Sequence, residues 1–287
     1  MDAPSIDEFR SIILDYYREA GRDLPWRHTR DPWAILVSEV MLQQTQTDRV
    51  AVYWQRWLER WPTPAALAAA SLEEVLAAWS GLGYNRRARF LREAARAVVN
   101  EHGATMPQNA AALQTLPGVG PYTVGATACF AYGEPVVIIE TNIRAVFLHF
   151  FFNDKNDVHD RELFPLIEES LWREDPRSWY YGLMDYGARL KKLRSNPSRQ
   201  SRHHAKQSRF EGSLREARGN ILRALSKGGP SCFEALASYR EEGRPSLADS
   251  PDGRSRLERA LADLIAEGLL EKYGPQGDEL HYRIRQD

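Results

Sequence analysis

The most informative part of the sequence is the segment Leu116-Pro-Gly-Val-Gly-Pro-Tyr-Thr123. Gly118 and Gly120 flank the apolar residue Val119, and such a pattern is typical of a tight turn between two helices. Such a turn leaves the backbone amides of Val119 and Gly120, and those of the next helix's first turn, available to a phosphate. The sequence therefore predicts a phosphate-binding turn, with an ordinary helical hairpin as the alternative.

A carboxylate follows this turn at a short distance in the sequence. The apolar run at residues 136–139 ends in Glu140, which lies 17 residues after Thr123 and opens the segment Glu140-Thr-Asn-Ile-Arg144. Thr141 or Asn142 can cap a new helix there. We therefore expect an acid near the phosphate-binding turn, although a glutamate favoured only by the helix dipole gives the same pattern.

Length and composition limit the class of protein. The chain has 287 residues, of which 43% are hydrophobic, enough for two domains with their own cores. No run of 18 apolar residues occurs, and the N-terminus is acidic, so we expect a cytoplasmic location. Cys129 and Cys232 are the only cysteines in the sequence. They provide neither a disulfide framework nor a four-thiolate metal site, so we expect no metal and no cofactor.

Positive charge is concentrated in one segment, although the formal net charge is −1. Residues 188–209 contain eight Lys or Arg and no Asp or Glu. With Ser, Asn and Pro between the charges, this segment is interpreted as an irregular basic connector over residues 188–210. Lys191, Lys192 and Arg194 are its candidate phosphate contacts, and a solvated linker is the alternative.

Glu39 lies within an unusually apolar stretch. Residues 33–46 are predicted to form a core helix that places Glu39, Gln43 and Gln46 on one face. Burial raises the pKa of a carboxyl group towards the value that a general acid needs at neutral pH. Glu39 is therefore a candidate acid, the alternative being a glutamate that faces solvent.

Residues 81–89 combine glycines, one aromatic residue and three arginines. This composition suits a loop pressed against DNA, with Tyr84 able to wedge between bases and Arg86 and Arg87 able to bind phosphates. A helix-to-helix turn with a solvated arginine face is the alternative.

The region from residue 211 to 287 is predicted to be a small separate domain. Three helices are expected at 221–225, 232–239 and 255–267, followed by a β-ribbon that begins at Leu270. This order resembles a winged helix, a common DNA-binding architecture, although its near-neutral charge also permits a protein-binding role. The ribbon tip at residues 274–277, with Lys272, Arg283 and Arg285 nearby, is the predicted phosphate contact.

Residues 24 to about 187 resemble the helix-hairpin-helix DNA glycosylases, and among them the MutY-type adenine glycosylases. The resemblance is carried by Leu24-Pro-Trp26, Ser38-Glu-Val-Met-Leu-Gln-Gln-Thr-Gln46, Trp79-Ser-Gly-Leu-Gly-Tyr84, Leu116-Pro-Gly-Val-Gly120 and Met184-Asp-Tyr-Gly187. It implies a mainly α, two-lobed glycosylase domain, which we place at residues 1–187. The basic connector and the winged-helix-like domain, predicted above from composition and pattern, follow it. The resemblance further implies an enzyme that flips a mispaired base out of double-stranded DNA and hydrolyses its N-glycosidic bond.

The resemblance also assigns catalytic roles. Glu39 corresponds to the acid that protonates the leaving adenine at N7, and Glu140 stands where the family has an aspartate that stabilises the sugar cation. Asn142 corresponds to an asparagine that supports these acids. Tyr122 occupies the position of the Schiff-base lysine in related lyases, which implies a monofunctional enzyme.

Further residues are implied to contact DNA. These are Gln43, Gln44, Tyr84, Arg86, Arg87, Gly118, Val119, Gly120 and Thr123. The sequence departs from the family in two other places. The four-cysteine iron–sulfur loop expected after Gly187 is replaced by the basic connector, and the C-terminal region does not resemble the Nudix-like module that reads 8-oxoguanine.

Three functions stay open at this point. The first is removal of adenine opposite guanine or 8-oxoguanine. The second is a mismatch thymine, uracil or hypoxanthine glycosylase on the same scaffold, which also has a tyrosine at the hairpin position. The third is a DNA mismatch- or structure-binding protein that has lost catalysis through the change at Glu140.

Overall fold

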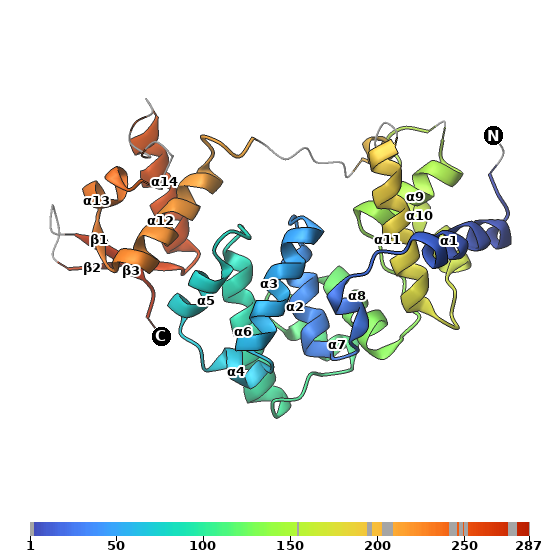
Figure 1. Cartoon of the computed structure of the whole chain (residues 1–287), viewed down its shortest axis with the longest axis horizontal. Helices are drawn as coiled ribbons and strands as arrows, with labels where there is room; N and C mark the ends of the chain where they lie inside the picture. Colours follow the sequence, from blue (N-terminus) through green and yellow to red (C-terminus); the bar gives the residue numbers. More distant parts are fainter. Residues whose placement is uncertain are drawn as a thin grey trace. The chain divides into compact units, whose positions relative to one another are not determined.

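The computed structural model describes residues 3–153, 155–193, 197–202, 209–240, 246, 249, 252–274 and 280–286, without the side chains of residues 193 and 198. The chain divides into two compact units. The first unit contains residues 1–39, 106–115 and 119–206, and the second contains residues 40–105, 116–118 and 207–287. Figure 1 labels their elements. In the described part of the chain, every helix is too short or too polar to cross a membrane.

The first unit is helical. Its elements are α1 (Ile6–Ala20), the 3₁₀ helix η1 (Pro25–His28), most of α2 (Pro32–Leu42), α7 (Ala110–Thr115), α8 (Pro121–Tyr132), α9 (Thr141–Phe151), α10 (Asp160–Ser170), α11 (Pro176–Leu193) and the 3₁₀ helix η2 (Pro197–Gln200). Helix α1 begins at a capping box, in which Ser5 and Glu8 bond each other's backbone amides. The 3₁₀ helix η1 begins at Pro25, because a proline can open a helix where its missing N–H is not needed.

Aromatic side chains fill the core of the first unit around α8, α9 and α11. The ring of Phe9 meets Phe147 and Trp179 edge to face, with centroids 5.2 Å and 5.6 Å away. Phe130 of α8 stacks on Tyr181 of α11 at 4.5 Å. These side chains are nearly inaccessible to solvent, so the core fixes the three helices that carry the candidate site.

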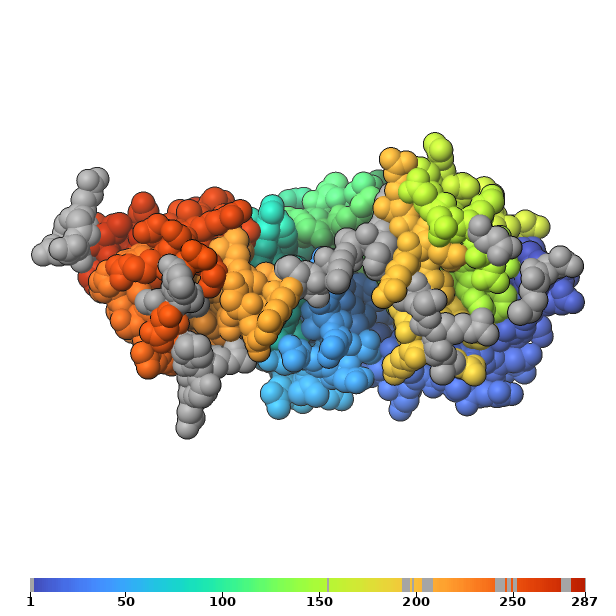
Figure 2. Space-filling view, turned by 90° about the horizontal axis from the view of Figure 1, so that it is seen from above, coloured from blue at the N-terminus to red at the C-terminus, as the bar shows by residue number. Residues whose placement is uncertain are grey.

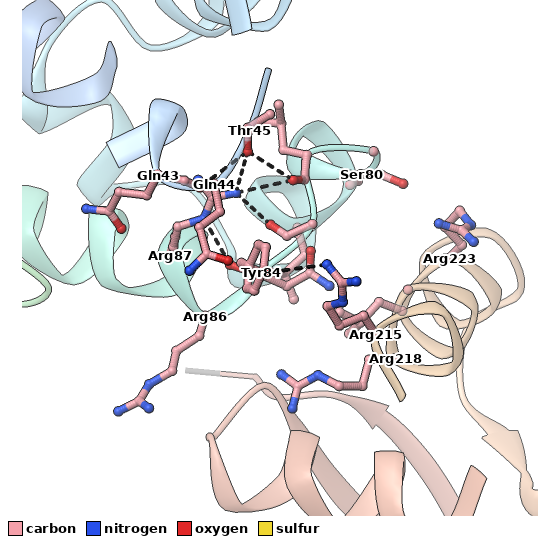
Figure 3. A pocket seen from close by; sticks show the side chains of 18 of the residues that line it. Gln43, Gln44, Thr45, Ser80, Tyr84, Arg86, Arg87, Arg215, Arg218 and Arg223 are labelled. Carbon is pink, nitrogen blue, oxygen red and sulfur yellow. Dashed lines mark hydrogen bonds between the residues drawn. The ribbon is translucent and has the colours of Figure 1, made fainter. Parts of the chain in front are cut away.

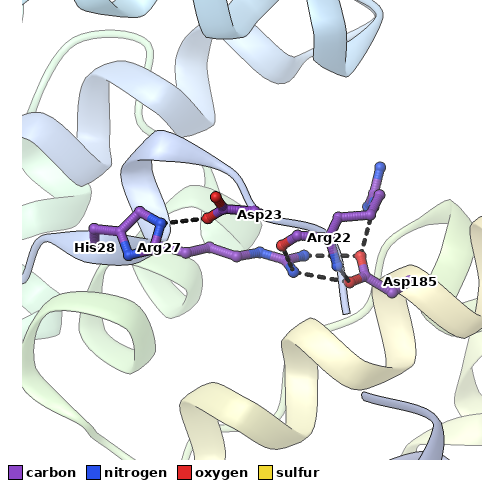
Figure 4. A network of polar contacts seen from close by, with 5 residues as sticks. All are labelled: Arg22, Asp23, Arg27, His28 and Asp185. Atoms are coloured by element: carbon purple, nitrogen blue, oxygen red, sulfur yellow. Dashed lines mark hydrogen bonds and ion pairs between the residues drawn. The ribbon is translucent and has the colours of Figure 1, made fainter. Parts of the chain in front are cut away.

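A buried carboxylate ties the segment after α1 to α11 (Figure 4). Asp185 accepts hydrogen bonds from the backbone N–H of Arg22 at 2.8 Å, from Arg22 Nε at 2.6 Å and from both terminal nitrogens of Arg27 at 2.8 Å. Burial opposes ionisation of Asp185, but these bonds and the positive charges of Arg27 and Arg22 outweigh it and lower the pKa of Asp185 below its usual value. Asp185 therefore anchors the chain that leads into α2.

The second unit combines helices with a small sheet. Its elements are α3 (Thr47–Arg60), α4 (Pro64–Ala68), α5 (Leu72–Trp79), α6 (Arg86–His102), α12 (Leu214–Gly228), β1 (Ser231–Cys232), α13 (Phe233–Ser238), α14 (Gly253–Ala266), β2 (Leu270–Tyr273) and β3 (His281–Ile284). The antiparallel sheet has the order β1-β3-β2, with Leu270 opposite Ile284. Helix α3 and helix α12 are both exposed on the face of this unit seen in Figure 2.

The predicted fold class is confirmed, while three local predictions are wrong. The chain is mainly helical and has a small C-terminal domain with the predicted ribbon, but the two-residue strand β1 was missed. Helix α2 ends at Leu42, so Glu39, Gln43 and Gln46 do not share a helical face. Helix α11 continues to Leu193, so residues 188–193 of the expected irregular connector are helical.

Candidate active site

Glu39 lies in the last turn and a half of α2 and is 4% exposed. The helix begins where Asp31 Oδ1 accepts the N–H of Trp33 at 3.0 Å. Its apolar residues are buried on all sides, including Ile35, Val37 and Val40. Because this helix belongs to the core, it carries the one glutamate in its sequence into the interior, as the sequence predicted.

The Glu39 carboxylate has one polar neighbour from the hairpin helix. The hydroxyl of Tyr122 donates to Glu39 Oε2 at 3.0 Å. The pKa of Glu39 is raised from 4.5 to about 7. Burial is the largest cause and the negative charge of Glu140 adds to it, while the Tyr122 hydrogen bond and the charge of Arg27 act in the opposite direction. Burial also raises the pKa of Tyr122 well above its usual value, so the phenol keeps its proton. Near neutral pH, Glu39 is therefore partly protonated and can act as an acid.

Glu140 itself caps helix α9. Its Oε1 accepts the backbone N–H of Asn142 at 2.7 Å and of Ile143 at 2.9 Å, and its Oε2 accepts Asn142 Nδ2 at 3.2 Å. The prediction that Thr141 or Asn142 caps this helix is therefore wrong. Glu140 has an extended backbone, and its side chain, which is longer than that of an aspartate, folds back onto the first turn of α9. The hydrogen bonds made there fix the carboxylate in position.

A lysine from α11 continues this arrangement. Lys191 Nζ donates to Asn142 Oδ1 at 2.8 Å, so the amide of Asn142 bridges Lys191 and Glu140. Gly187, one turn earlier on α11, makes this possible, because a Cβ there would lie 2.3 Å from the carbonyl oxygen of Asn142. Burial lowers the pKa of Lys191 although the charge of Glu140 opposes this.

The role of Lys191 differs from the sequence prediction. We expected this residue to bind phosphate from an irregular connector, but its ammonium group lies on the Asn142 amide. The i and i+4 spacing of Gly187 and Lys191 on a helix was the available signal. Lys192 is exposed near the end of α11, and Arg194 lies outside the described residues.

The hairpin turn has the expected backbone. Gly118 has a φ of 76°, and a side chain there would also clash, with its Cβ 2.6 Å from that of Phe90. Gly120 is the N-cap residue of α8 and is exposed, and Pro121 follows it at the first helical position. The side chains of Val119 and Thr123 are buried. Any contact of these two residues with DNA must therefore use the backbone.

Among the predicted DNA contacts in the second unit, Arg87 is misassigned. Its side chain is 9% exposed. Its guanidinium donates to the carbonyls of Val40, Met41, Gln43, Leu82 and Gly83 and to Thr45 Oγ1. Burial lowers the pKa of Arg87 to about 10, which still leaves it charged at neutral pH. Arg87 therefore holds two loops together instead of facing a ligand.

The other candidates of this unit stay accessible. Gln44 and Arg86 are exposed, and Gln43 and Tyr84 are half-buried. Gln44 and Tyr84 both have positive φ values, 57° and 48°, which are uncommon for residues other than glycine. Such backbone strain is often found where a loop presents side chains to a ligand.

The residues of this chain do not fit an iron–sulfur cluster. Four thiolates are needed to hold one, and the sequence has two cysteines, Cys129 and Cys232, both free. Within the described residues, His, Cys, Asp and Glu side chains nowhere gather in threes in an arrangement suited to a metal ion.

Comparisons with known proteins are consistent with this geometry. Residues 37–171 match the HhH-GPD superfamily of base excision DNA repair proteins. A thymine/uracil-DNA glycosylase of Methanothermobacter thermautotrophicus is 34% identical over 190 residues, which are 63% of this chain and 83% of the relative. The chain belongs to the HhH-GPD superfamily.

Two further relatives bear on its position within that superfamily. An adenine DNA glycosylase of Mycobacterium tuberculosis is 50% identical over 148 residues, 50% of this chain and 49% of the relative. The match with this relative thus spans about half of its length. The structure of a thermostable thymine-DNA glycosylase aligns with a TM-score of 0.60 and 31% identity, covering 66% of this chain and 88% of that one.

Proposed function

We propose that this chain is a monofunctional DNA glycosylase that removes adenine mispaired with guanine or 8-oxoguanine. The observation that carries the proposal is the environment of Glu39, a buried carboxyl group whose pKa is raised to about 7 and whose charge is coupled to that of Glu140. Two carboxyl groups in different environments are what cleavage of a glycosidic bond requires. The similarity to adenine DNA glycosylases supports adenine as the base.

In the proposed reaction, Glu39 gives its proton to N7 of the flipped adenine, which makes the base a neutral leaving group. The bond between C1′ and N9 then breaks, and its electron pair goes to the base. The positive charge that develops on the sugar is stabilised by Glu140, which helix α9 and Asn142 hold in place. Water adds to C1′ and its released proton returns to the ionised Glu39, which leaves an abasic site and restores the acid. We expect this sequence of steps to need no cofactor.

Tyr122 supports the monofunctional assignment. A lyase needs an amine to attack C1′, whereas Tyr122 offers a phenol whose proton is already bonded to Glu39. The expected product is an intact strand with an abasic site, which breaks only after alkali is added.

We propose duplex DNA with a mispair as the partner of a monomeric protein in the nucleoid. The exposed glycines of the turn before α8 support binding of a phosphate there.

A second candidate substrate is thymine or uracil opposite guanine. The support is the relative from Methanothermobacter thermautotrophicus, which the match covers over 83% of its length. An acid at the base assists purine release more than pyrimidine release, so the buried Glu39 favours adenine.

The test is a single-turnover cleavage panel on duplexes that carry A, T, U or hypoxanthine opposite G or 8-oxoguanine. Wild-type protein should cleave at adenine, and Glu39→Gln and Glu140→Gln should each lower the rate by at least about 100-fold while duplex binding is kept. The exposed Glu19→Gln is the matched control and should leave the rate unchanged. Cleavage at thymine or uracil alone would show that the substrate is the pyrimidine and not adenine. Full activity of Glu39→Gln would show that Glu39 is not the acid of the reaction.

A further inference from the structure

The second unit contains a groove with a volume of about 1460 Å³. One wall comes from Gln43, Gln44 and the loop at residues 81–86, and the other from helix α12 of the C-terminal domain (Figure 3). The first wall contains the residues expected to touch DNA. The second wall was not expected to take part, because we assigned phosphate contacts of that domain to the ribbon.

The charged side chains that line the groove are predominantly basic. Among its described lining residues, seven are Lys or Arg and one, Glu267, is acidic, and Glu267 is paired with Arg218. Amide side chains, including Gln43 and Gln44, supply most of the remaining polar groups on the loop wall. Such a surface fits a polyanion with hydrogen-bonding groups.

Helix α12 presents three of its basic residues, Arg215, Arg223 and Lys227, along one face. Arg215, Gly219, Arg223 and Lys227 are spaced by four residues, so they follow one face of the helix, and all four line the groove. The opposite face, with Ile221 and others, is buried in the C-terminal domain. From Arg215 to Arg223 the helix rises about 12 Å, which matches three to four nucleotides of a DNA strand at about 3.4 Å each.

A direct contact joins the two walls. Arg215 Nη1 donates to the hydroxyl of Tyr84 at 3.2 Å, and the guanidinium carbon of Arg215 lies 5.8 Å from the centre of the Tyr84 ring. Tyr84 is also the loop residue with a strained positive φ. The loop that is expected to probe the duplex is therefore held by the C-terminal domain.

The ribbon is less suited to this role in its described part. Arg283 is paired with Glu271 through a hydrogen bond of 2.6 Å and lies over the ring of Tyr273. Residues 275–279, which include most of the ribbon tip that we expected to bind phosphate, lie outside the described residues.

We infer that this groove binds the sugar–phosphate backbone of duplex DNA, so that helix α12 and the loop at residues 81–86 form one DNA-binding surface. The inference rests on the proposed function as a DNA-acting enzyme and assigns to the C-terminal domain a share of the backbone contacts. Arg215 and Arg223 are the principal phosphate ligands on α12.

The test is the salt dependence of binding to an undamaged duplex, measured by fluorescence anisotropy with the full chain. Each lost phosphate contact reduces the slope of log K against log salt by about 0.9. Arg215→Gln with Arg223→Gln should therefore flatten the slope by nearly two and weaken binding at least about tenfold at 100 mM salt. Arg215→Lys with Arg223→Lys keeps both charges and should restore the slope. Arg254→Gln, which removes an exposed arginine of α14 paired with Glu234, is the control.

The outcomes separate this inference from the proposed function. An unaltered slope in the glutamine pair, in a protein whose melting curve matches wild type, would overturn the groove as a DNA site even if adenine is excised. A flattened slope in a protein that cleaves none of the panel duplexes would support the groove and reject the glycosylase proposal. If the glutamine pair does not fold, a variant that combines Arg215→Lys, Arg223→Lys and Lys227→Gln takes its place. Its salt slope should be about 0.9 smaller than that of the wild-type protein, and an unaltered slope would overturn the inference.

Discussion

Replacing Glu39 by Gln should make the protein more stable at alkaline pH while abolishing its proposed activity. The pKa of Glu39 is raised from 4.5 to about 7 because the carboxyl group is buried. Between these two values the folded chain keeps a proton that the unfolded chain has released, so the free energy of unfolding falls as the pH rises. Above pH 7 the folded state carries a buried charge, and the penalty has reached its full size.

The penalty follows from the difference between the two pKa values. A difference of 2.5 units, from 4.5 to 7, corresponds to about 3 kcal/mol at pH 8 and to less than about 1 kcal/mol at pH 5. The substituted glutamine side chain has no charge to bury, and its amide oxygen can still accept the Tyr122 hydroxyl. The variant should therefore gain about 3 kcal/mol over wild type at pH 8 and little at pH 5.

Urea unfolding followed by tryptophan fluorescence at pH 5, 6, 7 and 8 measures this difference. The exposed Glu19→Gln serves as the control and should track wild type at each pH. Equal stability of Glu39→Gln and wild type across the whole range would refute the argument, because it would mean that Glu39 ionises in the folded protein as readily as in water.

Three other changes have definite expected outcomes. Tyr122→Phe removes a hydrogen bond that favours the ionised form of Glu39 and should therefore raise the pKa of this carboxyl group. The alkaline limb of the single-turnover pH profile should move to a higher pH by about one unit, and an unmoved limb would exclude Glu39 as the titrating acid. Asp185→Asn leaves Arg22 and Arg27 without their buried carboxylate and should lower the free energy of unfolding, measured with urea, by about 3–5 kcal/mol. A decrease below about 1 kcal/mol would contradict the anchoring role of Asp185. Gly187→Ala should push Asn142 of α9 away from α11 and lower the single-turnover rate at least about tenfold, while the affinity for duplex DNA is kept. A normal rate would show that α9 and α11 can separate without loss of activity.

Features that depend on neighbouring residues could be predicted before the structure was known. An uninterrupted apolar helix can only be buried, so the burial of Glu39 followed from residues 33–41 alone. The hairpin turn followed from its glycines, one of which has the positive φ that such a turn requires. The ribbon at the C-terminus likewise followed from a turn between two short apolar segments.

Hydrogen bonds between residues far apart in the chain became visible only in the folded structure. Arg87 and Arg86 are adjacent in a basic run, yet one is buried on loop carbonyls about 45 residues away and the other faces solvent. Lys191 and Asn142 are 49 residues apart, and Arg215 and Tyr84 are 131 apart. No periodicity in the sequence records such pairs, because a hydrogen bond between distant segments depends on how the helices pack and leaves no pattern in the residues beside it.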